Sequence, residues 1–439
     1  MIDIPIRRGY GTAQMSSSRR IPQRAALLAI GDEVLRGEIG NSNAAFIAER
    51  LFELGYEVTE QVVVSDDPQS IRAALVRLRA EMDIIISTGG LGPTEDDRTV
   101  DTVAELLATG THADEPSLEA MKKRFSTHGF EMTPNNLRQV RVPNGGEAMP
   151  NAAGIAPGFA VQLGGAEAFF LPGVPREMEK IFTDEVLPRL VRRLAEIGGP
   201  PPAVRTWHLY GMGESHIDHR LAGILTGIEG ATLHFRTSAP VNHVKLVVRQ
   251  ADAEAAKAVV DKVDAEIRKR IGPGIYGVDG ETFIGAVSKA LRAQEATLAF
   301  AESCTGGLAG ELATSEAGSS DFFRGSIVAY ANDVKTGVLG VKPETIADFG
   351  AVSEPAAREM AEGAKRVCGS SVAVAITGVA GPEGGAPDKP VGTVCFAICG
   401  PGTTRTSTKL FAGTRERVRM AAAYYALDLA RRYFDTRKR

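Results

Sequence analysis

Short apolar runs alternate with amphipathic segments along the first part of the chain. The runs that are typical of buried strands are Ala25–Ile30, Val58–Val64 and Asp83–Thr88. Between them, apolar residues recur at helical spacing, first at Ile47, Leu51 and Leu54 and then at Ile71, Ala74, Leu75 and Leu78. This strand–helix–strand–helix–strand order predicts a parallel sheet with helices on both faces.

The pattern changes after about residue 175. Strand-like runs are now separated by longer polar stretches, at Val204–Leu209, His234–Thr237 and Val244–Arg249. Helical spacing is found near Ser215–Leu225 and over Ala253–Arg270. This is the pattern of a small α+β module, and Gly272-Pro273-Gly274 predicts a break in the chain after it.

A second α/β pattern begins at about Glu281. Its predicted strands are Thr297–Ala301, Ser326–Tyr330, Val372–Thr377 and Val391–Ile398, and its main helices are Pro355–Arg366 and Thr414 to about Tyr433. We therefore predict an α/β protein in which two domains with parallel or mixed sheets flank a small α+β module. The predicted boundaries are 24–175, 176–275 and 281–435.

Composition limits the classes of protein to which this chain can belong. Its 439 residues are too many for one core, and 44% apolar and 24% charged residues are ordinary for a soluble globular protein. A net charge of −4 gives no reason to expect nucleic-acid binding, and no apolar run approaches the ~18 residues of a membrane span. The cysteines form no disulfide framework, so we expect a cytoplasmic protein; they are Cys304, Cys368, Cys395 and Cys399.

Residues 1–23 differ from the rest of the chain in charge. They carry four arginines and a single acid, with three consecutive serines at Ser16–Ser18. This composition is typical of a disordered tail. An organelle transit peptide, or a true start at Met15, is the alternative.

One segment of the C-terminal domain carries candidate chemistry. Ala301–Gly307 follows a strand and precedes a helix, which puts Ser303 at the carboxyl edge of the predicted sheet. A helix start there supplies N–H groups that can stabilise an oxyanion, and the small residues leave room for a ligand. The alternative is that these residues only cap the helix.

A serine nucleophile needs a base, and this domain contains no histidine. All seven histidines precede residue 281, at positions 112, 128, 208, 216, 219, 234 and 243. Unless another domain or subunit supplies a histidine, the remaining candidates are Tyr330, at the end of the next predicted strand, and Lys335 shortly after it. Parallel strands would bring both to the edge that carries Ser303, although Lys335 as a solvated surface lysine is the alternative. Cys304 is a rival nucleophile whose activation is no better explained.

Other features of this domain indicate a small, phosphate-bearing ligand. Thr377–Pro382 is a strand followed by a glycine-containing loop, and two arginines stand in the first turn of the last helix, where an anion would offset them. For each arginine alone, a solvated surface position is the alternative. The candidate ligand-binding residues are Thr305, Gly306, Gly307, Asn332, Thr377, Gly378, Gly381, Arg415 and Arg417.

The N-terminal domain has a glycine-rich loop of its own at Thr88–Thr94. It follows a buried strand and precedes a helix near Arg98, so backbone N–H groups can approach a phosphate. Nearby carboxylates suit a divalent metal bound to a pyrophosphate, whereas a glycine turn with an acidic helix start is the alternative. The candidate metal ligands are Asp32, Asp66, Asp96 and Asp97. The candidate nucleotide-binding residues are Gly31, Glu33, Asn43, Thr88, Gly89, Gly90, Gly92, Pro93 and Thr94.

Five ordered motifs in the last third of the chain resemble the CinA C-terminal domain. They are AESCTGG (301–307), YANDVK (330–335), VSEP (352–355), TGVAGP (377–382) and KPVGTV (389–394). The resemblance implies deamidation of nicotinamide mononucleotide to nicotinate mononucleotide and ammonia, without a cofactor. It also implies Ser303 as the nucleophile and Tyr330 and Lys335 as its activating partners, and leaves open which of the two takes the proton.

Motifs in the N-terminal domain resemble the molybdopterin-binding-like domain of CinA proteins. They are GDEVLRG (31–37), Asn41–Asn43, TGGLGPTEDD (88–97), GIAPGF (154–159) and LPGVPREM (171–178). The resemblance implies ADP-ribose pyrophosphatase activity with a divalent metal such as Mg, Mn or Co. Ile155 stands where the family pattern has threonine, which weakens the match. Leu91 replaces the threonine of true molybdopterin enzymes, which argues against a molybdenum-cofactor role.

Together these features predict a bifunctional hydrolase of pyridine-nucleotide salvage. Its expected partners are nicotinamide mononucleotide, ADP-ribose and a second copy of the chain, with no nucleic acid and no membrane. One alternative is a deamidase whose N-terminal domain only binds nucleotides. Another is a DNA-uptake or recombination accessory protein, for which neither the net charge nor the 6% aromatic content gives support.

Overall fold

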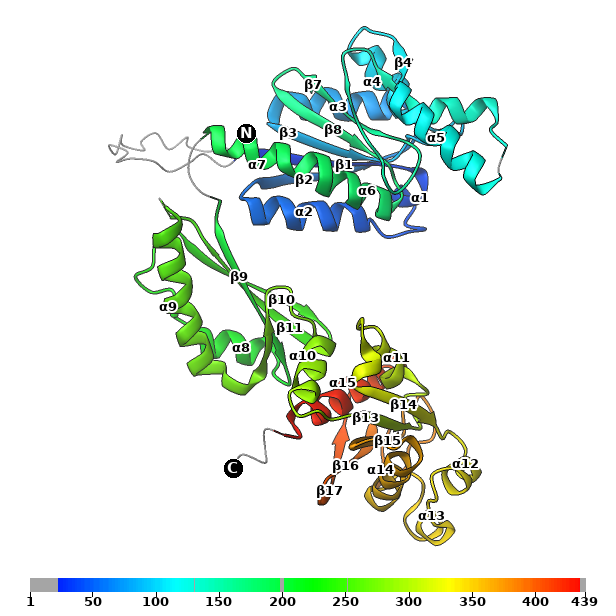
Figure 1. Ribbon diagram of the computed structural model, residues 1–439. Coiled ribbons are helices and arrows are strands. Elements are labelled where there is room, and N and C mark those ends of the chain that lie inside the picture. Colours follow the sequence, from blue (N-terminus) through cyan, green and yellow to red (C-terminus); the bar gives the residue numbers. More distant parts are fainter. Residues whose placement is uncertain (1–22, 130, 198–200, 251, 435–439) are drawn as a thin grey trace, which may run out of the picture. The chain divides into compact units, whose positions relative to one another are not determined.

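The computed structural model describes residues 23–129, 131–197, 201–250 and 252–434 (Figure 1). Residues 1–22 lie outside the described part, and with them almost all of the predicted N-terminal extension and the alternative start at Met15. The chain divides into two compact units, residues 1–204 with 247–260 and residues 205–246 with 261–439. Two large mixed sheets and one small sheet confirm the predicted fold class.

The N-terminal sheet has the strand order β2-β1-β3-β8-β7-β6. Its first four strands are parallel, and β7 and β6 continue the sheet in antiparallel pairing. The bounds are β1 (Arg24–Ile30), β2 (Glu57–Val64), β3 (Ile84–Thr88), β6 (Glu147–Met149), β7 (Gly158–Leu163) and β8 (Ala166–Leu171). Because β1 lies between β2 and β3, the chain switches direction across the sheet at β1. The carboxyl ends of β1 and β3 border this switch point, where open α/β sheets bind ligands.

Strand β1 is apolar throughout because both of its faces are buried. Leu28 and Ile30 pack in one core with residues of α3 and α4, while Leu27 packs in a second core with residues of α2 and α6. The helical elements of this domain are α1 (Asp32–Leu35), α2 (Ser42–Leu54), α3 (Pro68–Glu81), α4 (Thr99–Leu106), α5 (Glu115–His128), η1 (Pro134–Val140), α6 (Pro175–Ile181), the π-helical η2 (Phe182–Val186) and α7 (Leu187–Ile197). A separate strand pair consists of β4 (Thr111–Ala113) and β5 (Arg141–Pro143).

The predicted α+β module contains a four-stranded sheet of order β10-β11-β9-β12. Its elements are β9 (Ala203–Tyr210), α8 (Glu214–Leu221), β10 (Ala231–Ser238), β11 (Val241–Val248), α9 (Ala253–Ile271), η3 (Gly272–Gly274) and β12 (Ile275–Val278). The three predicted strands and two predicted helices are all present. Strand β10 begins three residues before the predicted start at His234.

The C-terminal sheet has the strand order β14-β13-β15-β16-β17. Strand β13 is parallel to its neighbours β14 and β15, and β16 and β17 are antiparallel. The strands are β13 (Leu298–Glu302), β14 (Phe323–Val328), β15 (Val372–Gly378), β16 (Thr393–Gly400) and β17 (Thr403–Leu410). The chain leaves β13 for β14 on one side and returns to β15 on the other. The carboxyl end of β13 is therefore a second topological switch point.

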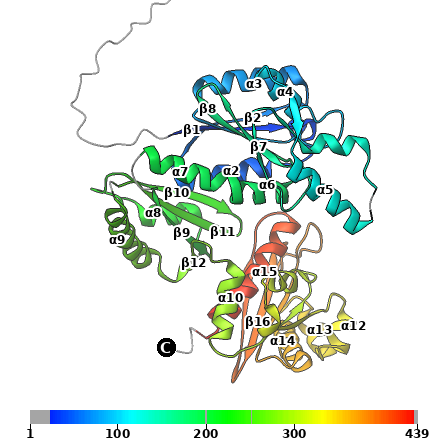
Figure 2. The same cartoon turned by 45° about the horizontal axis from the view of Figure 1, so that its top comes forward.

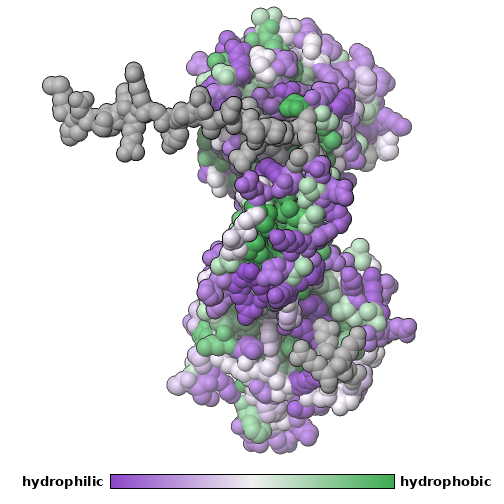
Figure 3. Space-filling model, turned by 90° about the vertical axis from the view of Figure 1, so that its left-hand side faces the viewer, coloured by the Kyte–Doolittle hydropathy of each residue, from purple (hydrophilic) through white to green (hydrophobic). Residues whose placement is uncertain are grey.

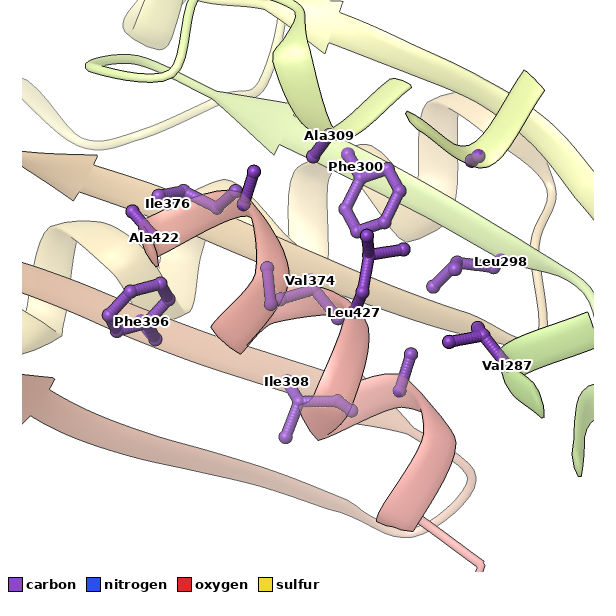
Figure 4. Close-up of a cluster of buried hydrophobic side chains, with 14 of the residues drawn as sticks. Val287, Leu298, Phe300, Ala309, Val374, Ile376, Phe396, Ile398, Ala422 and Leu427 are labelled. Atoms are coloured by element: carbon purple, nitrogen blue, oxygen red, sulfur yellow. The ribbon is translucent and has the colours of Figure 1, made fainter. Parts of the chain in front are cut away.

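Helices cover both faces of this sheet (Figures 1 and 2). On one face α10 and α15 pack on Leu298, Phe300 and Val374, as the close-up in Figure 4 shows. On the other face, small residues of β13 such as Ala299 and Ala301 pack against α14. The helices are α10 (Phe283–Arg292), α11 (Leu308–Thr314), η4 (Ser319–Asp321), α12 (Asn332–Gly337), α13 (Pro343–Phe349), α14 (Glu354–Cys368) and α15 (Arg415–Arg432).

The hydrophilic character of the surface in Figure 3 agrees with the share of charged residues in the sequence. On the face shown in Figure 3, hydrophilic side chains predominate and hydrophobic ones occur in separate patches. Over the described residues, no helix combines the length and the apolar character that a membrane span requires.

Candidate active site

Ser303 is the first residue after β13, at the switch point of the C-terminal sheet. Its backbone N–H still donates to the carbonyl of Ile376 on β15 at 2.9 Å, so the sheet fixes the backbone of this residue. Only 9% of the residue is exposed, which leaves the hydroxyl a limited path to solvent.

Lys335, in the short helix α12, reaches this hydroxyl. Its Nζ lies 3.1 Å from Ser303 Oγ and donates to the carbonyls of Ala329 and Tyr330 at 2.9 and 2.8 Å. The residue is 1% exposed, and among the described residues no carboxylate pairs with its amine. Burial lowers the pKa of Lys335 below its ordinary value, because the charged form loses its hydration. The alternative of a solvated surface lysine is therefore wrong.

The three contacts of Lys335 accommodate either protonation state of its amine. A neutral –NH2 has two N–H donors and one lone pair, whereas an ammonium has three donors and no lone pair. The carbonyls of Ala329 and Tyr330 accept from two N–H groups of Lys335, and the third bonding position on Nζ points to Ser303 Oγ. In the neutral form, the lone pair of Lys335 is therefore directed at the serine proton, as a general base requires.

Tyr330 has a different relation to the serine. Its residue is 60% exposed, its carbonyl accepts from Lys335, and its hydroxyl accepts from Arg415 at 3.2 Å. Within the described part of the chain, no hydrogen bond joins the Tyr330 hydroxyl to Ser303. Tyr330 therefore links the lysine to an arginine of α15, and Lys335 is the group in contact with the serine.

Cys304, the rival nucleophile, is 5% exposed. Burial, together with the charge of Glu302, raises the pKa of its thiol to about 12. The thiolate is the nucleophilic form of cysteine, so this environment disfavours a reactive Cys304.

The start of α11 does not offer the free N–H groups that its sequence position suggests. The buried carboxylate of Glu302 accepts from the N–H groups of Gly307, Ala309 and Gly310 at 2.9–3.0 Å. This expectation needs correction, because the chain fills its own anion-binding helix start with the side chain of Glu302.

Arginines of α15 reach the loop and its neighbours. Arg415 donates to the carbonyl of Gly381 at 2.8 Å, and Arg419 donates to the carbonyl of Thr305 from Nε at 3.3 Å and from a terminal nitrogen at 2.8 Å. Sequence patterns did not single out Arg419, although its place one turn after Arg415 puts both on one helix face. Arg417, which lies two residues after Arg415, is exposed, and its aliphatic stem lies beside Gly413.

Three of the other predicted ligand-binding residues are committed to packing. The Thr377 hydroxyl donates to the carbonyl of Ala351 at 2.8 Å. A Cβ on Gly378 would lie 2.7 Å from Val394, and one on Gly381 would lie 2.5 Å from Val391, so both positions require glycine. The remaining members of the set occupy the loop or its edge: Thr305 has a buried hydroxyl without a partner among the described residues, Gly306 and Gly307 have left-handed backbones, and Asn332 is exposed.

The N-terminal loop 88–94 lies at the other switch point. A Cβ on Gly89 would lie 2.0 Å from the carbonyl oxygen of Ile30, so the start of this loop packs directly against the end of β1. The carboxylate of Asp97 accepts from the N–H groups of Gly92 and Thr94 at 2.7 and 2.8 Å and from the Thr94 hydroxyl. Asp97 therefore holds the loop closed around Pro93.

The acids at this edge form a cluster rather than a finished metal site. Asp66 accepts from the N–H of Asp32 at 3.0 Å. Its pKa is raised, chiefly by burial and also by the charges of Glu33, Asp32 and Asp96. Among the described residues, no three His, Cys, Asp or Glu side chains are placed to hold a metal ion.

Asn43 and the remaining candidates lie around the same edge. The side-chain amide of Asn43 donates to the carbonyl of Gly173 at 2.8 Å, while its buried Oδ1 has no partner among the described residues. A Cβ on Gly31 would lie 2.8 Å from Glu33, so these two residues are in direct contact. The end of β3 and the loop that follows it place the remaining predicted nucleotide-binding residues at this edge of the sheet, namely Thr88, Gly90 and Thr94.

Fold and site together define a class: a modular α/β protein whose C-terminal domain places a serine beside a buried lysine. Three family models match it in order. They are "Probable molybdopterin binding domain" over residues 26–192, "Damage-inducible protein CinA KH domain" over 204–277 and "CinA C-terminal domain" over 281–434. The chain belongs to the CinA family.

Similar proteins extend over nearly the whole chain. A CinA-like protein of Anaeromyxobacter sp. (strain Fw109-5) is 42% identical and covers 94% of this chain and 99% of its own. A putative competence-damage inducible protein of Symbiobacterium thermophilum is 40% identical over 93% and 98%. The crystal structure of a competence damage-inducible protein A from Klebsiella pneumoniae is 37% identical, covers 35% of this chain and 95% of its own, and has a TM-score of 0.34. The KH match falls on the module in which sequence patterns pointed to no chemistry.

Proposed function

We propose that the C-terminal domain hydrolyses the carboxamide of nicotinamide mononucleotide, with Ser303 as nucleophile and Lys335 as general base. The observation that carries this proposal is the buried amine of Lys335, 3.1 Å from Ser303 Oγ and anchored by two carbonyls. A serine with a lysine base is a known variant of the catalytic triad. The identity of the amide comes from the resemblance of the motifs around these residues to the CinA C-terminal domain.

The reaction follows from these contacts. Ser303 Oγ attacks the carboxamide carbon while its proton passes to the neutral Nζ of Lys335, and the carbonyl electron pair moves to oxygen. Collapse of this tetrahedral oxyanion breaks the carbon–nitrogen bond, and the Lys335 ammonium gives its proton to the nitrogen, which leaves as ammonia. Water then attacks the Ser303 ester and gives a proton to Lys335. Ser303 takes that proton back as nicotinate mononucleotide departs.

The cations beside the loop support a substrate with a phosphate. Arg415 and Arg419 both lie close enough to Cys304 to act on its thiol electrostatically, which puts two guanidinium groups beside the nucleophile loop. Their positive charge favours an anionic nucleotide over a neutral nicotinamide.

Ammonia release tests this proposal directly. The full chain should convert nicotinamide mononucleotide to nicotinate mononucleotide, and Ser303→Ala should abolish the reaction without altering the circular dichroism spectrum. Full activity in Ser303→Ala would remove the serine from the mechanism.

For the N-terminal domain we propose metal-dependent hydrolysis of the ADP-ribose pyrophosphate. Support comes from the acid cluster around Asp66 at the switch point beside loop 88–94. A bound divalent cation would neutralise pyrophosphate oxygens, and the carboxylates of Asp66, Asp32 and Asp96 would supply only part of its ligands, with the rest from water and substrate. Incubation with ADP-ribose and Mg²⁺, Mn²⁺ or Co²⁺ should release AMP. Binding of ADP-ribose without release of AMP would instead indicate a regulatory domain.

A further inference from the structure

We infer that Glu302 and Arg419 are positioning residues that hold loop 303–307 from opposite sides and leave the N–H groups of Cys304 and Thr305 to stabilise the oxyanion. The inference rests on the proposed deamidase function. Neither residue needs to touch the substrate. Both act through the backbone that carries Ser303.

Glu302 holds the loop from inside the domain. The residue is completely buried, and its two carboxylate oxygens accept from three backbone N–H groups and from the Ser326 hydroxyl at 2.6 Å. A buried carboxylate is tolerated only when such donors replace its lost hydration. Because Gly307, Ala309 and Gly310 all bond to one rigid group, the loop between Ser303 and α11 has little freedom to move.

Arg419 holds the loop from the side of α15. Two of its N–H groups donate to the carbonyl oxygen of Thr305. A peptide unit is planar, so fixing this carbonyl also fixes the N–H of Gly306, which donates to the carbonyl of Ser303 at 3.1 Å. The turn that follows the nucleophile is therefore closed on itself and tied to α15.

Two amides of the loop take no part in these bonds, and one of them, the N–H of Cys304, contacts only the sulfur of its own side chain. The N–H groups of Cys304 and Thr305 find no acceptor in another residue of the described chain, whereas those of Ser303, Gly306 and Gly307 are all used. In serine hydrolases of the α/β type, the N–H of the residue after the nucleophile commonly stabilises the oxyanion. The N–H of Cys304 has this position directly after Ser303, and the N–H of Thr305 follows it in the same loop.

The test compares inhibition by pyridine-3-boronic acid with turnover, using the full chain. Boron forms a tetrahedral adduct with a serine oxygen and so imitates the oxyanion intermediate, and an inhibition constant does not depend on how much of the protein is folded. Glu302→Gln keeps the size of the side chain but loses an acceptor for the N–H groups. We expect kcat to fall by about 10²–10³-fold, KM to change little, and the boronate inhibition constant to rise in parallel with the loss of kcat.

Two further variants are compared with Glu302→Gln, a matched control and a milder substitution. Glu311→Gln removes an exposed acid of α11 and should leave both constants unchanged. Arg419→Lys keeps the charge but loses the paired donors, and should show the same effects as Glu302→Gln to a smaller degree, about tenfold. If Glu302→Gln does not fold, Arg419→Lys alone decides.

The outcomes separate the inference from the proposed function. Wild-type inhibition constants in both variants, or in Arg419→Lys alone, would overturn the inference. Wild-type protein that binds the boronate but releases no ammonia from nicotinamide mononucleotide would overturn the proposed function, while the boronate comparison would still test the positioning role.

Discussion

Replacing Lys335 with alanine removes the amine that contacts Ser303 and leaves the rest of the loop in place. General-base catalysis contributes about 10²–10⁴-fold to a rate, which at about 1.4 kcal/mol per tenfold is about 3–5 kcal/mol of barrier. We expect kcat/KM for nicotinamide mononucleotide to fall by this factor. The carbonyls of Ala329 and Tyr330 lose their donor, and water in the space left by the side chain can replace it.

Chemical rescue makes this prediction specific to the base. The substitution opens a cavity in which a small primary amine has the same two carbonyls as acceptors. Added methylamine or ethylamine should restore part of the activity of Lys335→Ala, in proportion to the concentration of the neutral amine. Lys342→Ala, which removes an exposed lysine nearby, should behave like the wild type.

The assay is ammonia release at saturating and limiting substrate, with circular dichroism to confirm the fold. If Lys335→Ala keeps more than about a tenth of the activity at neutral pH, a loss smaller than general-base catalysis predicts, the base is not Lys335. Tyr330 would then be the remaining candidate.

Three further expectations follow from the same geometry. Burial lowers the pKa of Lys335 and the base must be neutral, so kcat/KM should rise with pH through an apparent pKa below the ordinary lysine value and then level off. A profile that rises only near the ordinary lysine pKa of ~10.4 would contradict this. Cys304→Ala should keep activity within about threefold, and iodoacetamide should not inactivate the wild type, because a thiol with a pKa of about 12 is not ionised at neutral pH. Arg415→Ala should raise KM for nicotinamide mononucleotide by about tenfold, the effect of a lost charged hydrogen bond, and should change turnover of the phosphate-free riboside much less. An equal effect on both substrates would show that Arg415 does not interact with the phosphate.

Much of this site follows from the sequence because it depends on local pattern and on sheet topology. Strand β13 and the small residues after it are visible in the sequence, and parallel pairing of β13 and β14 accounts for the approach of Lys335 to Ser303. The absence of histidine from the domain by itself narrows the choice of base to lysine or tyrosine.

Other parts depend on contacts that a single sequence does not reveal. Lys335 stands in the last turn of a short polar helix, where a lysine is usually solvated, and only the packed fold buries it. Arg419 meets Thr305 across 114 positions of the chain, and Glu302 occupies a helix start that sequence reasoning assigns to a ligand. Strand β17 lacks an apolar alternation because it lies at the sheet edge and carries mostly hydroxyl and charged side chains.

Trapping the acyl-enzyme shows most directly whether Ser303 is the nucleophile. The full chain is mixed with nicotinamide mononucleotide, quenched in acid within one turnover, digested and analysed by mass spectrometry. We expect a nicotinate mononucleotide ester on Ser303, absent from Ser303→Ala and accumulating more slowly in Lys335→Ala. An adduct on Cys304 or Tyr330, or ammonia release that persists in Ser303→Ala, would contradict it.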